Sequence, residues 1–302
     1  MAVVAHDAGA ARLLFSWLRP LKQQLRFYVE GPALGILEQE FPGTKVHPDL
    51  EVCLERTQLL LSGTGWSSDL EHRARLIAAA QGLQSIAVVD HWVNYHERFH
   101  RDGCFVVPQS LWVADAEAAK IAQREFPNLA VQQLPNIWLN KLVEDVWACK
   151  RSLQRTERQH PACNLLYFME PLRDHQSGDL TGEEFVALEY WLDQLPVLIE
   201  TNQIHQDIKA LRMRLRPHPS EPVGKYETWI KKQAYEWPLE LDPHPSLVTS
   251  LAYADLAFGC ETQALVAALA CDITAISTLP PSAPPCRLPH RKLQHLAHRS
   301  RP

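Results

Sequence analysis

Several polar loops of this sequence could do chemistry, because each directly follows a segment that is predicted to be a buried strand. Ligands of open parallel sheets bind beyond the carboxyl ends of the strands. The first such loop, residues 6–11, reads His-Asp-Ala-Gly-Ala-Ala. Its small residues would let the backbone approach a ligand, and the helix that follows would offer free N–H groups. We expect His6, Asp7 and Gly9 to bind an acceptor or a sugar, with a tight turn capped by Asp7 as the structural alternative.

The second loop, residues 63–71, combines glycines with hydroxyl, aromatic and acidic side chains. Glycine permits strained backbone and the close approach of a ligand. A helix cap at Ser67 or Ser68, completed by Glu71, would explain the serines and the glutamate but not the glycines. Asp69 is a candidate catalytic base, because a carboxylate in a cleft can deprotonate a sugar hydroxyl. The residues that we expect to bind the acceptor or the sugar here are Gly63, Thr64, Gly65 and Trp66.

The third loop, residues 90–100, is dense in polar and aromatic side chains. Such a mixture suits a sugar, whose flat apolar faces pack on rings while its hydroxyls bind polar groups. A metal site built from Asp90 and the histidines of the loop is one alternative, although their spacing does not match a zinc-binding helix. A helix capped by Asp90 is the structural alternative. We expect Asp90 to be a second candidate catalytic base and His91, Asn94 and Tyr95 to bind the acceptor or the sugar.

The fourth loop, residues 214–221, follows a strand of the second half and holds His218 between Pro217 and Pro219. A histidine between two prolines has little backbone freedom, which suits a hydrogen-bond donor that is positioned before a phosphate arrives. Arg216 could form charge-assisted hydrogen bonds to phosphate oxygens. We predict that His218 is catalytic and that both residues bind the donor. An exposed histidine in a proline-bound turn is the alternative.

The fifth loop, residues 258–265, runs from a strand through a glycine into a helix. The start of a helix can hold a phosphate through its backbone N–H groups, and the Thr262 hydroxyl could add to this. Glu261 would suit the hydroxyls of a ribose. We therefore expect Gly259, Glu261 and Thr262 to bind the donor. A helix with an acidic first turn is the alternative.

The combination of His218-Pro219 with Glu261-Thr262 at a later helix start resembles the second half of GT-B glycosyltransferases. It is similar to the His-Pro motif and the later Ser/Thr motif of bacterial sialyltransferases, polysialyltransferases and CDP-glycerol glycerophosphotransferases. The resemblance implies that the histidine and the hydroxyl hold the phosphates of a nucleotide donor. The chain also resembles the UDP-N-acetylglucosamine 2-epimerase group, which shares the GT-B fold. The acidic D/E-D/E-G motif of the sialyltransferase families is absent, so the base is left open among Asp7, Asp69 and Asp90.

The elements that must position these loops are short apolar runs that alternate with amphipathic stretches, a pattern typical of parallel sheets covered on both faces. We expect first-half strands at residues 2–5, 25–29, 58–61, 85–89 and 111–113, with helices at 10–24, 69–81 and 115–126. We expect second-half strands at 164–168, 211–215, 256–258 and 273–276, with helices at 183–200, 226–235 and 261–270. The fold class is therefore α/β and GT-B-like, with two doubly wound Rossmann-like domains and a central cleft.

The charged stretch of residues 150–160 separates the two halves and is expected to be the linker. We place an acceptor-side domain at residues 1–148 and a domain that binds the nucleotide-sugar donor at residues 149–302. The end of the chain, residues 280–302, is rich in proline, histidine and arginine. It is expected to be either a tail or a segment packed over the first domain.

The composition excludes several classes of protein. Of the 302 residues, 46% are hydrophobic and 22% are charged, which excludes a disordered chain. The formal net charge of -5 gives no reason to expect nucleic acid as a partner. The seven cysteines include no CxxC pair, which favours reduced thiols in a cytosol. We expect a cytoplasmic protein without a signal peptide or membrane span, and contact with a membrane surface is left open.

These features predict a glycosyltransferase that moves a sugar from a CMP- or UDP-linked donor to a glycan or a bacterial surface polysaccharide. No Asp-x-Asp metal clamp is evident, so we expect protein groups alone to neutralise the leaving nucleotide, with no metal and no cofactor. A UDP-N-acetylglucosamine 2-epimerase or a hydrolysing relative would use the same groups without an acceptor. A non-catalytic protein that binds nucleotides or carbohydrates is the third reading.

Overall fold

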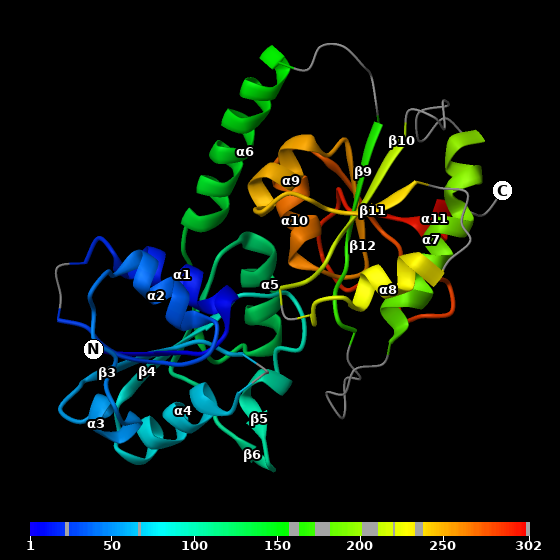
Figure 1. Cartoon of the computed structure of the whole chain (residues 1–302). Coiled ribbons are helices and arrows are strands. Elements are labelled where there is room, and N and C mark those ends of the chain that lie inside the picture. Colours follow the sequence, from blue (N-terminus) through cyan, green and yellow to red (C-terminus); the bar gives the residue numbers. More distant parts are fainter. Residues whose placement is uncertain are drawn as a thin grey trace. The chain divides into compact units, whose positions relative to one another are not determined.

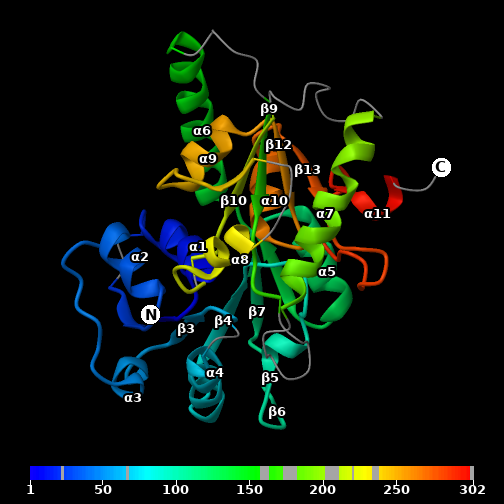
Figure 2. The ribbon, with the colours of Figure 1, turned by 45° about the vertical axis from the view of Figure 1, so that its right-hand side comes forward.

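The structure is a computed structural model that describes residues 1–21, 24–65, 68–156, 163–172, 182–200, 211–219, 221–232 and 238–299. The chain forms two compact units, Met1–Asn140 and Lys141–Pro302. Figures 1 and 2 show that each unit contains a sheet with helices packed around it.

The first unit is built on a parallel sheet in the strand order β2-β1-β3-β4-β7-β8. The strands are β1 (Ala2–Ala5), β2 (Arg26–Val29), β3 (Leu59–Ser62), β4 (Gln84–Val89), β7 (Ser110–Val113) and β8 (Ala130–Gln133). The helices are α1 (Ala8–Leu18), α2 (Ala33–Glu40), α3 (Leu50–Leu54), α4 (Leu70–Ala80) and α5 (Ala116–Glu125). A short 3-10 helix, η1 (Glu97–Phe99), leads into a hairpin of β5 (His100–Arg101) and β6 (Cys104–Phe105).

The order of the first sheet reverses at β1, which pairs with β2 on one side and with β3 on the other. Such a switch point opens a crevice beyond the carboxyl ends of the two central strands. The strand β1 is buried on both faces, because Val3 packs in one hydrophobic cluster and Val4 packs in another. This explains why the strand is a continuous apolar run rather than an alternating one.

The second unit repeats the plan with a parallel sheet in the order β11-β10-β9-β12-β13-β14. The strands are β9 (Cys163–Phe168), β10 (Leu211–Arg216), β11 (Leu239–Leu241), β12 (Leu256–Gly259), β13 (Thr274–Ser277) and β14 (Gln294–His295). The helices are α6 (Ile137–Thr156), which begins just before the unit does, α7 (Glu183–Glu200), α8 (Lys225–Lys232), α9 (Leu247–Tyr253), α10 (Gln263–Ala270) and α11 (Leu296–Arg299). The switch point of this sheet lies between β9 and β12.

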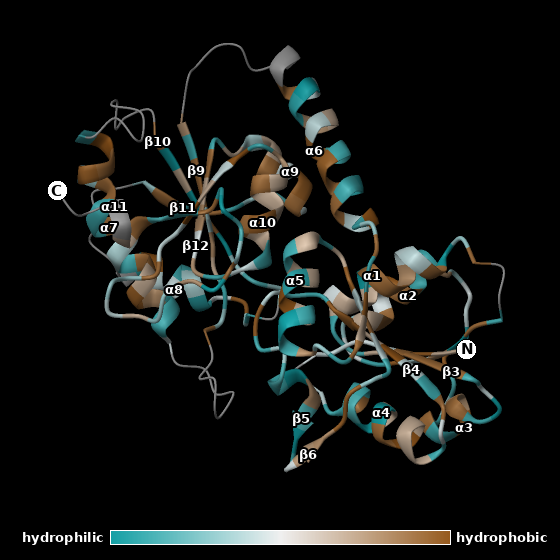
Figure 3. Ribbon diagram, turned by 180° about the vertical axis from the view of Figure 1, so that it is seen from behind, coloured by the Kyte–Doolittle hydropathy of each residue, from teal (hydrophilic) through white to brown (hydrophobic). Residues whose placement is uncertain are grey.

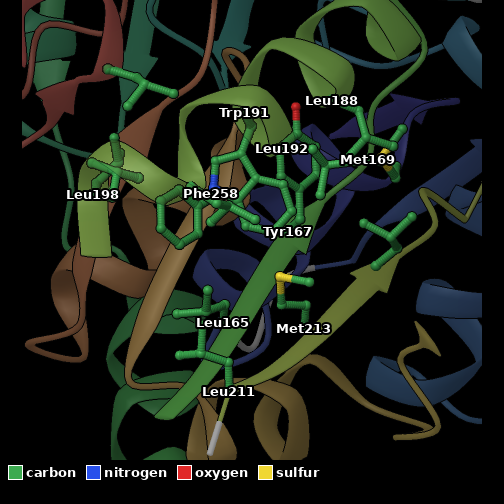
Figure 4. Close-up of a cluster of buried hydrophobic side chains, with 14 of the residues drawn as sticks. Leu165, Tyr167, Met169, Leu188, Trp191, Leu192, Leu198, Leu211, Met213 and Phe258 are labelled. Atoms are coloured by element: carbon green, nitrogen blue, oxygen red, sulfur yellow. The ribbon is translucent and has the colours of Figure 1, made fainter. Parts of the chain in front are cut away.

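The core of the second unit is centred on Trp191 of α7, which is fully buried (Figure 4). Its ring lies 5.0 Å, centroid to centroid, from the ring of Tyr167 on β9 and 5.0 Å from the ring of Phe258 on β12. Helix α10 is hydrophobic over most of its length, as its brown colour in Figure 3 shows. This packing holds the strands on both sides of the switch point in one rigid layer.

The α/β class and the two doubly wound parallel sheets are confirmed. Residues 150–156 of the expected linker continue helix α6, and the domain boundary at residues 148 and 149 stays a prediction. Leu142 and Val146 are buried one turn apart on this helix, and the charged residues around them form its exposed face. The rest of the expected linker, residues 157–162, lies outside the described residues.

The C-terminal segment also differs from both expectations. Residues 294–295 form β14, which pairs with β13 and so extends the sheet of the second unit. Leu288, Leu293 and Leu296 are buried, and these leucines explain why a proline-rich stretch packs onto the domain.

Candidate functional site

The switch point of the first sheet brings together His6 and Asp7, which follow β1, and Gly63 to Gly65, which follow β3. The His6 Nδ1 atom lies 2.7 Å from Asp7 Oδ1. Asp7 occupies the position that precedes α1, but its side chain makes no capping hydrogen bond. The structure therefore does not support the alternative in which Asp7 only caps a helix.

Two glycines of this site pack directly against carboxylates. A Cβ atom built on Gly65 would lie 2.1 Å from Asp7 Oδ2, and one built on Gly9 would lie 1.9 Å from Asp90 Oδ2. Real Cβ atoms essentially never come this close, so a side chain at either position would force the carboxylate to move. Close approach was predicted at these glycines, but the group that approaches is a carboxylate of a neighbouring loop.

The Asp90 side chain is 15% exposed and faces Arg98, whose Nη1 lies 3.4 Å from Asp90 Oδ1. The same Nη1 donates to the backbone oxygen of Thr64 at 2.9 Å, and the Arg98 Nε donates to the backbone oxygen of Val93 at 3.1 Å. The Thr64 hydroxyl is buried and donates to Val88 O at 2.9 Å. Arg98 therefore connects the loop after β3 to the loop after β4. The Thr64 hydroxyl adds a hydrogen bond from the first of these loops to strand β4.

Other residues of the first-half prediction lie in different surroundings. Asp69 is exposed at the start of α4 and makes no capping hydrogen bond with its side chain. The Tyr95 hydroxyl is buried and donates to Ala118 O at 3.2 Å, and burial raises the pKa of Tyr95 well above its ordinary value. Trp66 lies outside the described residues. The roles of Asp69 and Tyr95 at a site stay predictions.

The segment after Asp90 is not the capped helix that was one alternative, because only Glu97–Phe99 form a short 3-10 turn. Asn94 has a left-handed backbone with φ 59°, and His91 lies with its ring centroid 5.5 Å from that of Trp92. The positive φ of Asn94 marks a turn of the backbone within this loop. Ligand contacts of His91 and Asn94 stay predictions.

Sequence reasoning missed two buried charged residues that support this site. Glu71 of α4 is 1% exposed and accepts hydrogen bonds from His6 N at 3.0 Å and from Gly65 N at 3.1 Å. Arg75, one turn later, donates from Nη1 to Gly63 O at 2.8 Å, and burial lowers its pKa to about 10. A capping box was the signal at Glu71, but nothing in the pattern of the helix marks either residue as buried.

At the switch point of the second sheet, Glu170 follows β9 and Glu261 follows β12. Both carboxylate oxygens of Glu170 lie 3.2 Å from the backbone N of Glu261, which donates to them. The pKa of Glu170 is raised to about 8, mainly because the carboxyl group is buried; the backbone hydrogen bond from Glu261 lowers this pKa and the charge of Glu261 raises it. Glu170 was not expected from the sequence, and at neutral pH it is mainly a neutral acid.

The start of α10 uses the predicted Thr262 as its cap, because the hydroxyl accepts from Ala264 N at 3.3 Å. The Glu261 carboxylate pairs with Arg287, whose Nη2 lies 2.7 Å from Glu261 Oε2. Gly259 is close to β9, since a Cβ atom on it would lie 3.1 Å from Phe168 O. Binding of a donor by these residues stays a prediction.

Arg216 is held by its own unit. Its Nη1 lies 2.8 Å from Asp242 Oδ2 and donates to His244 O at 3.0 Å and to Ser250 Oγ at 2.7 Å. The Asp242 side chain is fully buried, so loss of Arg216 would leave a buried charge at the end of the sheet without its cation. This position also leaves Arg216 at the carboxyl end of β10, where a phosphate contact stays a prediction.

His218 is exposed on the loop that follows β10, and its backbone oxygen accepts from Glu221 N at 2.9 Å. A buried ion cluster anchors this loop to α7. Lys225 Nζ lies 2.6 Å from Glu184 Oε1 and 2.6 Å from Glu221 Oε2, and both glutamate side chains are only 2% exposed. His218 therefore projects from a loop whose base is fixed.

Among the described residues, no group of three or more His, Cys, Asp or Glu side chains is arranged to hold a metal ion. Within the same part of the chain, no helix combines the length and hydropathy that crossing a bilayer requires.

No protein-family model matches this sequence, and no curated protein matches it. Its fold is nevertheless similar to solved structures. One is the UDP-GlcNAc 2-epimerase of Methanocaldococcus jannaschii in complex with UDP-GlcNAc and UDP, with a TM-score of 0.59 at 10% identity over 91% of this chain and 83% of that chain. Another is MnaA of S. aureus solved with UDP, with a TM-score of 0.60 at 11% identity over 91% of this chain and 78% of that chain. The similarity confirms the GT-B-like fold with two Rossmann-like domains.

Proposed function

We propose that the chain is a glycosyltransferase that moves a sugar from a nucleotide-activated donor to a glycan acceptor. One observation carries the proposal: both sheets gather polar and ionisable side chains at their switch points, in a fold shared with proteins solved with UDP-GlcNAc and UDP. Function does not follow from fold alone, so the assignment rests on the chemistry of these side chains.

The second unit would bind the donor. A phosphate at the start of α10 would take the place of the Thr262 hydroxyl, which accepts from Ala264 N in this structure. His218 and Arg216 would add hydrogen bonds from the loop after β10. The raised pKa of Glu170 supports this proposal, because an ionised carboxylate this close to the start of α10 would repel a phosphate.

The first unit would activate the acceptor hydroxyl. Asp90 and Asp7 are half-buried carboxylates at strand ends, and a carboxylate in such a place can accept the proton of a sugar hydroxyl. Asp69 remains a candidate base, although it is exposed at the start of α4. Protein groups rather than a metal ion would neutralise the leaving nucleotide.

A second candidate function is epimerisation or hydrolysis of a nucleotide sugar. It is favoured by the similarity to a UDP-GlcNAc 2-epimerase, and the carboxylates of Asp7 and Asp90 could act as its acid and base. This enzyme would need no acceptor. A non-catalytic binder of nucleotides or carbohydrates would bind the same donor without turnover.

Product analysis of donor alone and of donor with candidate glycan acceptors separates these functions. A transferase gives a new glycoside only when an acceptor is present, at an unchanged rate in EDTA. An epimerised or hydrolysed sugar from donor alone would instead establish the second candidate, and binding without product would establish the third. Asp90→Asn should abolish turnover, whereas Asp145→Asn, at a position on α6 where the side chain is 41% exposed, is the matched control.

A further inference from the structure

The carboxylate of Glu71 joins two loops that are far apart in the sequence. It accepts a hydrogen bond from the backbone of His6 through Oε1 and one from the backbone of Gly65 through Oε2. Both donors lie at the switch point of the first sheet, one after β1 and the other after β3. A Cβ atom on Gly63 would lie 2.5 Å from Glu71 Oε1, so the backbone comes close to the carboxylate along this whole turn.

A buried carboxylate is a costly way to pack a helix against a sheet. Burial raises the pKa of Glu71, and the charge of Asp7 raises it further, while the two backbone donors and Arg75 lower it. An apolar residue would fill the same volume without this cost. What only an acceptor-rich side chain provides at this position is a fixed link between the His6 and Gly65 backbones.

The link also fixes the side chains that these loops carry. Asp7 is the next residue after His6, and its Oδ2 lies where a side chain on Gly65 would be. A shift of either loop by a fraction of an ångström would therefore change the contact between the Asp7 carboxylate and the Gly65 backbone. Errors of about 1 Å in the position of a reacting group can lower a rate by a factor on the order of 10².

We propose that Glu71 is a positioning residue that holds the His6–Asp7 loop in register with the Gly63–Gly65 loop. It acts through the backbone and does not contact the substrate itself. The effect on turnover rests on the proposed function, whereas the effect on the two backbone amides does not.

The variant Glu71→Gln tests this, because a glutamine has the size of glutamate but can accept from only one of the two N–H groups with its oxygen. Its amide nitrogen would face the other N–H group. We expect amide hydrogen exchange at His6 or Gly65 to accelerate while the rest of the first sheet keeps its protection. We expect kcat to fall by a factor on the order of 10², with the donor KM changed by less than about twofold.

Arg73→Gln is the control, since Arg73 is exposed on the same helix and should change neither exchange nor turnover. Wild-type exchange and turnover in Glu71→Gln would overturn the proposal. If that variant does not fold, slow exchange of both amides in the wild-type protein supports the proposal and fast exchange of either amide refutes it. A wild-type protein without turnover would contradict the proposed function alone, and the exchange data would still decide the role of Glu71.

Discussion

The three aspartates that could act as a base differ in their surroundings. Asp7 and Asp90 are half-buried, and each packs against a glycine of a neighbouring loop, whereas Asp69 is exposed. Fixed neighbours hold a carboxylate in one orientation, which a general base needs in order to meet a hydroxyl at hydrogen-bonding distance. The geometry therefore favours Asp90 and Asp7 over Asp69.

The exposed position of His218 allows a clean test of its role, because removal of its side chain leaves no cavity. A donor of this kind should stabilise the leaving nucleotide more in the transition state than in the ground state. We expect His218→Ala to fold normally and to lose turnover by a factor on the order of 10²–10³, as measured by steady-state kinetics. Wild-type turnover in this variant would show that His218 is an exposed turn residue without a role in catalysis.

Arg216 is a less suitable position than His218 for testing donor binding by substitution. An alanine there would leave the Asp242 carboxylate buried without its cation, and such a loss destabilises a protein by about 3–5 kcal/mol. Loss of nucleotide binding in that variant could therefore reflect damage to the end of the sheet.

At the residue scale, the sequence suggested which residues could form a site but not which side chains of other loops lie beside them. The glycines at 9 and 65 were predicted to let a ligand approach the backbone, whereas the groups that lie beside them in the structure are carboxylates of the protein. Their neighbours, Asp90 and Asp7, come from other loops and could be found only by folding the chain. Glu170 was missed for the same reason, since its burial depends on contacts across the sheet.

At the scale of elements, the loop that carries His218 depends on the cluster of Lys225, Glu184 and Glu221. Lys225→Met would leave two buried carboxylates without their cation, and we expect unfolding to become easier by on the order of 3 kcal/mol. Denaturant titration of both proteins measures this.

Lys120→Met is the matched control, because the Lys120 side chain is 68% exposed beside Glu117 and its loss should matter by less than about 0.5 kcal/mol. Equal unfolding midpoints for the Lys225 and Lys120 variants would mean that the cluster does not anchor the loop.

The elements that the sequence predicted are those with strong apolar patterns, such as β1, β4 and α7. The elements that were not anticipated include β8 and β11, which lie at sheet edges and carry polar residues, so their pairing rather than their pattern defines them. The last turns of helix α6 are not evident from the sequence, because charged residues outnumber the buried ones there.

At the scale of the whole molecule, the repetition of one plan in both units is what the sequence predicted best. Continuous apolar strands between helices specify parallel sheets covered on both faces, and this pattern is local. The ligand of each unit is not specified locally, because it depends on a few side chains at the strand ends.

The central claim, that the chain binds the nucleotide part of an activated sugar, is tested most directly by thermal unfolding with CMP, CDP, UDP and GDP. The measurement is made at about pH 7, below the raised pKa of Glu170. A ligand that binds only the folded state stabilises it by about 2.7 kcal/mol at roughly 100 times its Kd. We predict that at least one nucleotide raises Tm in a concentration-dependent way and that His218→Ala reduces this shift. An unchanged Tm with all four nucleotides at millimolar concentrations would contradict the account.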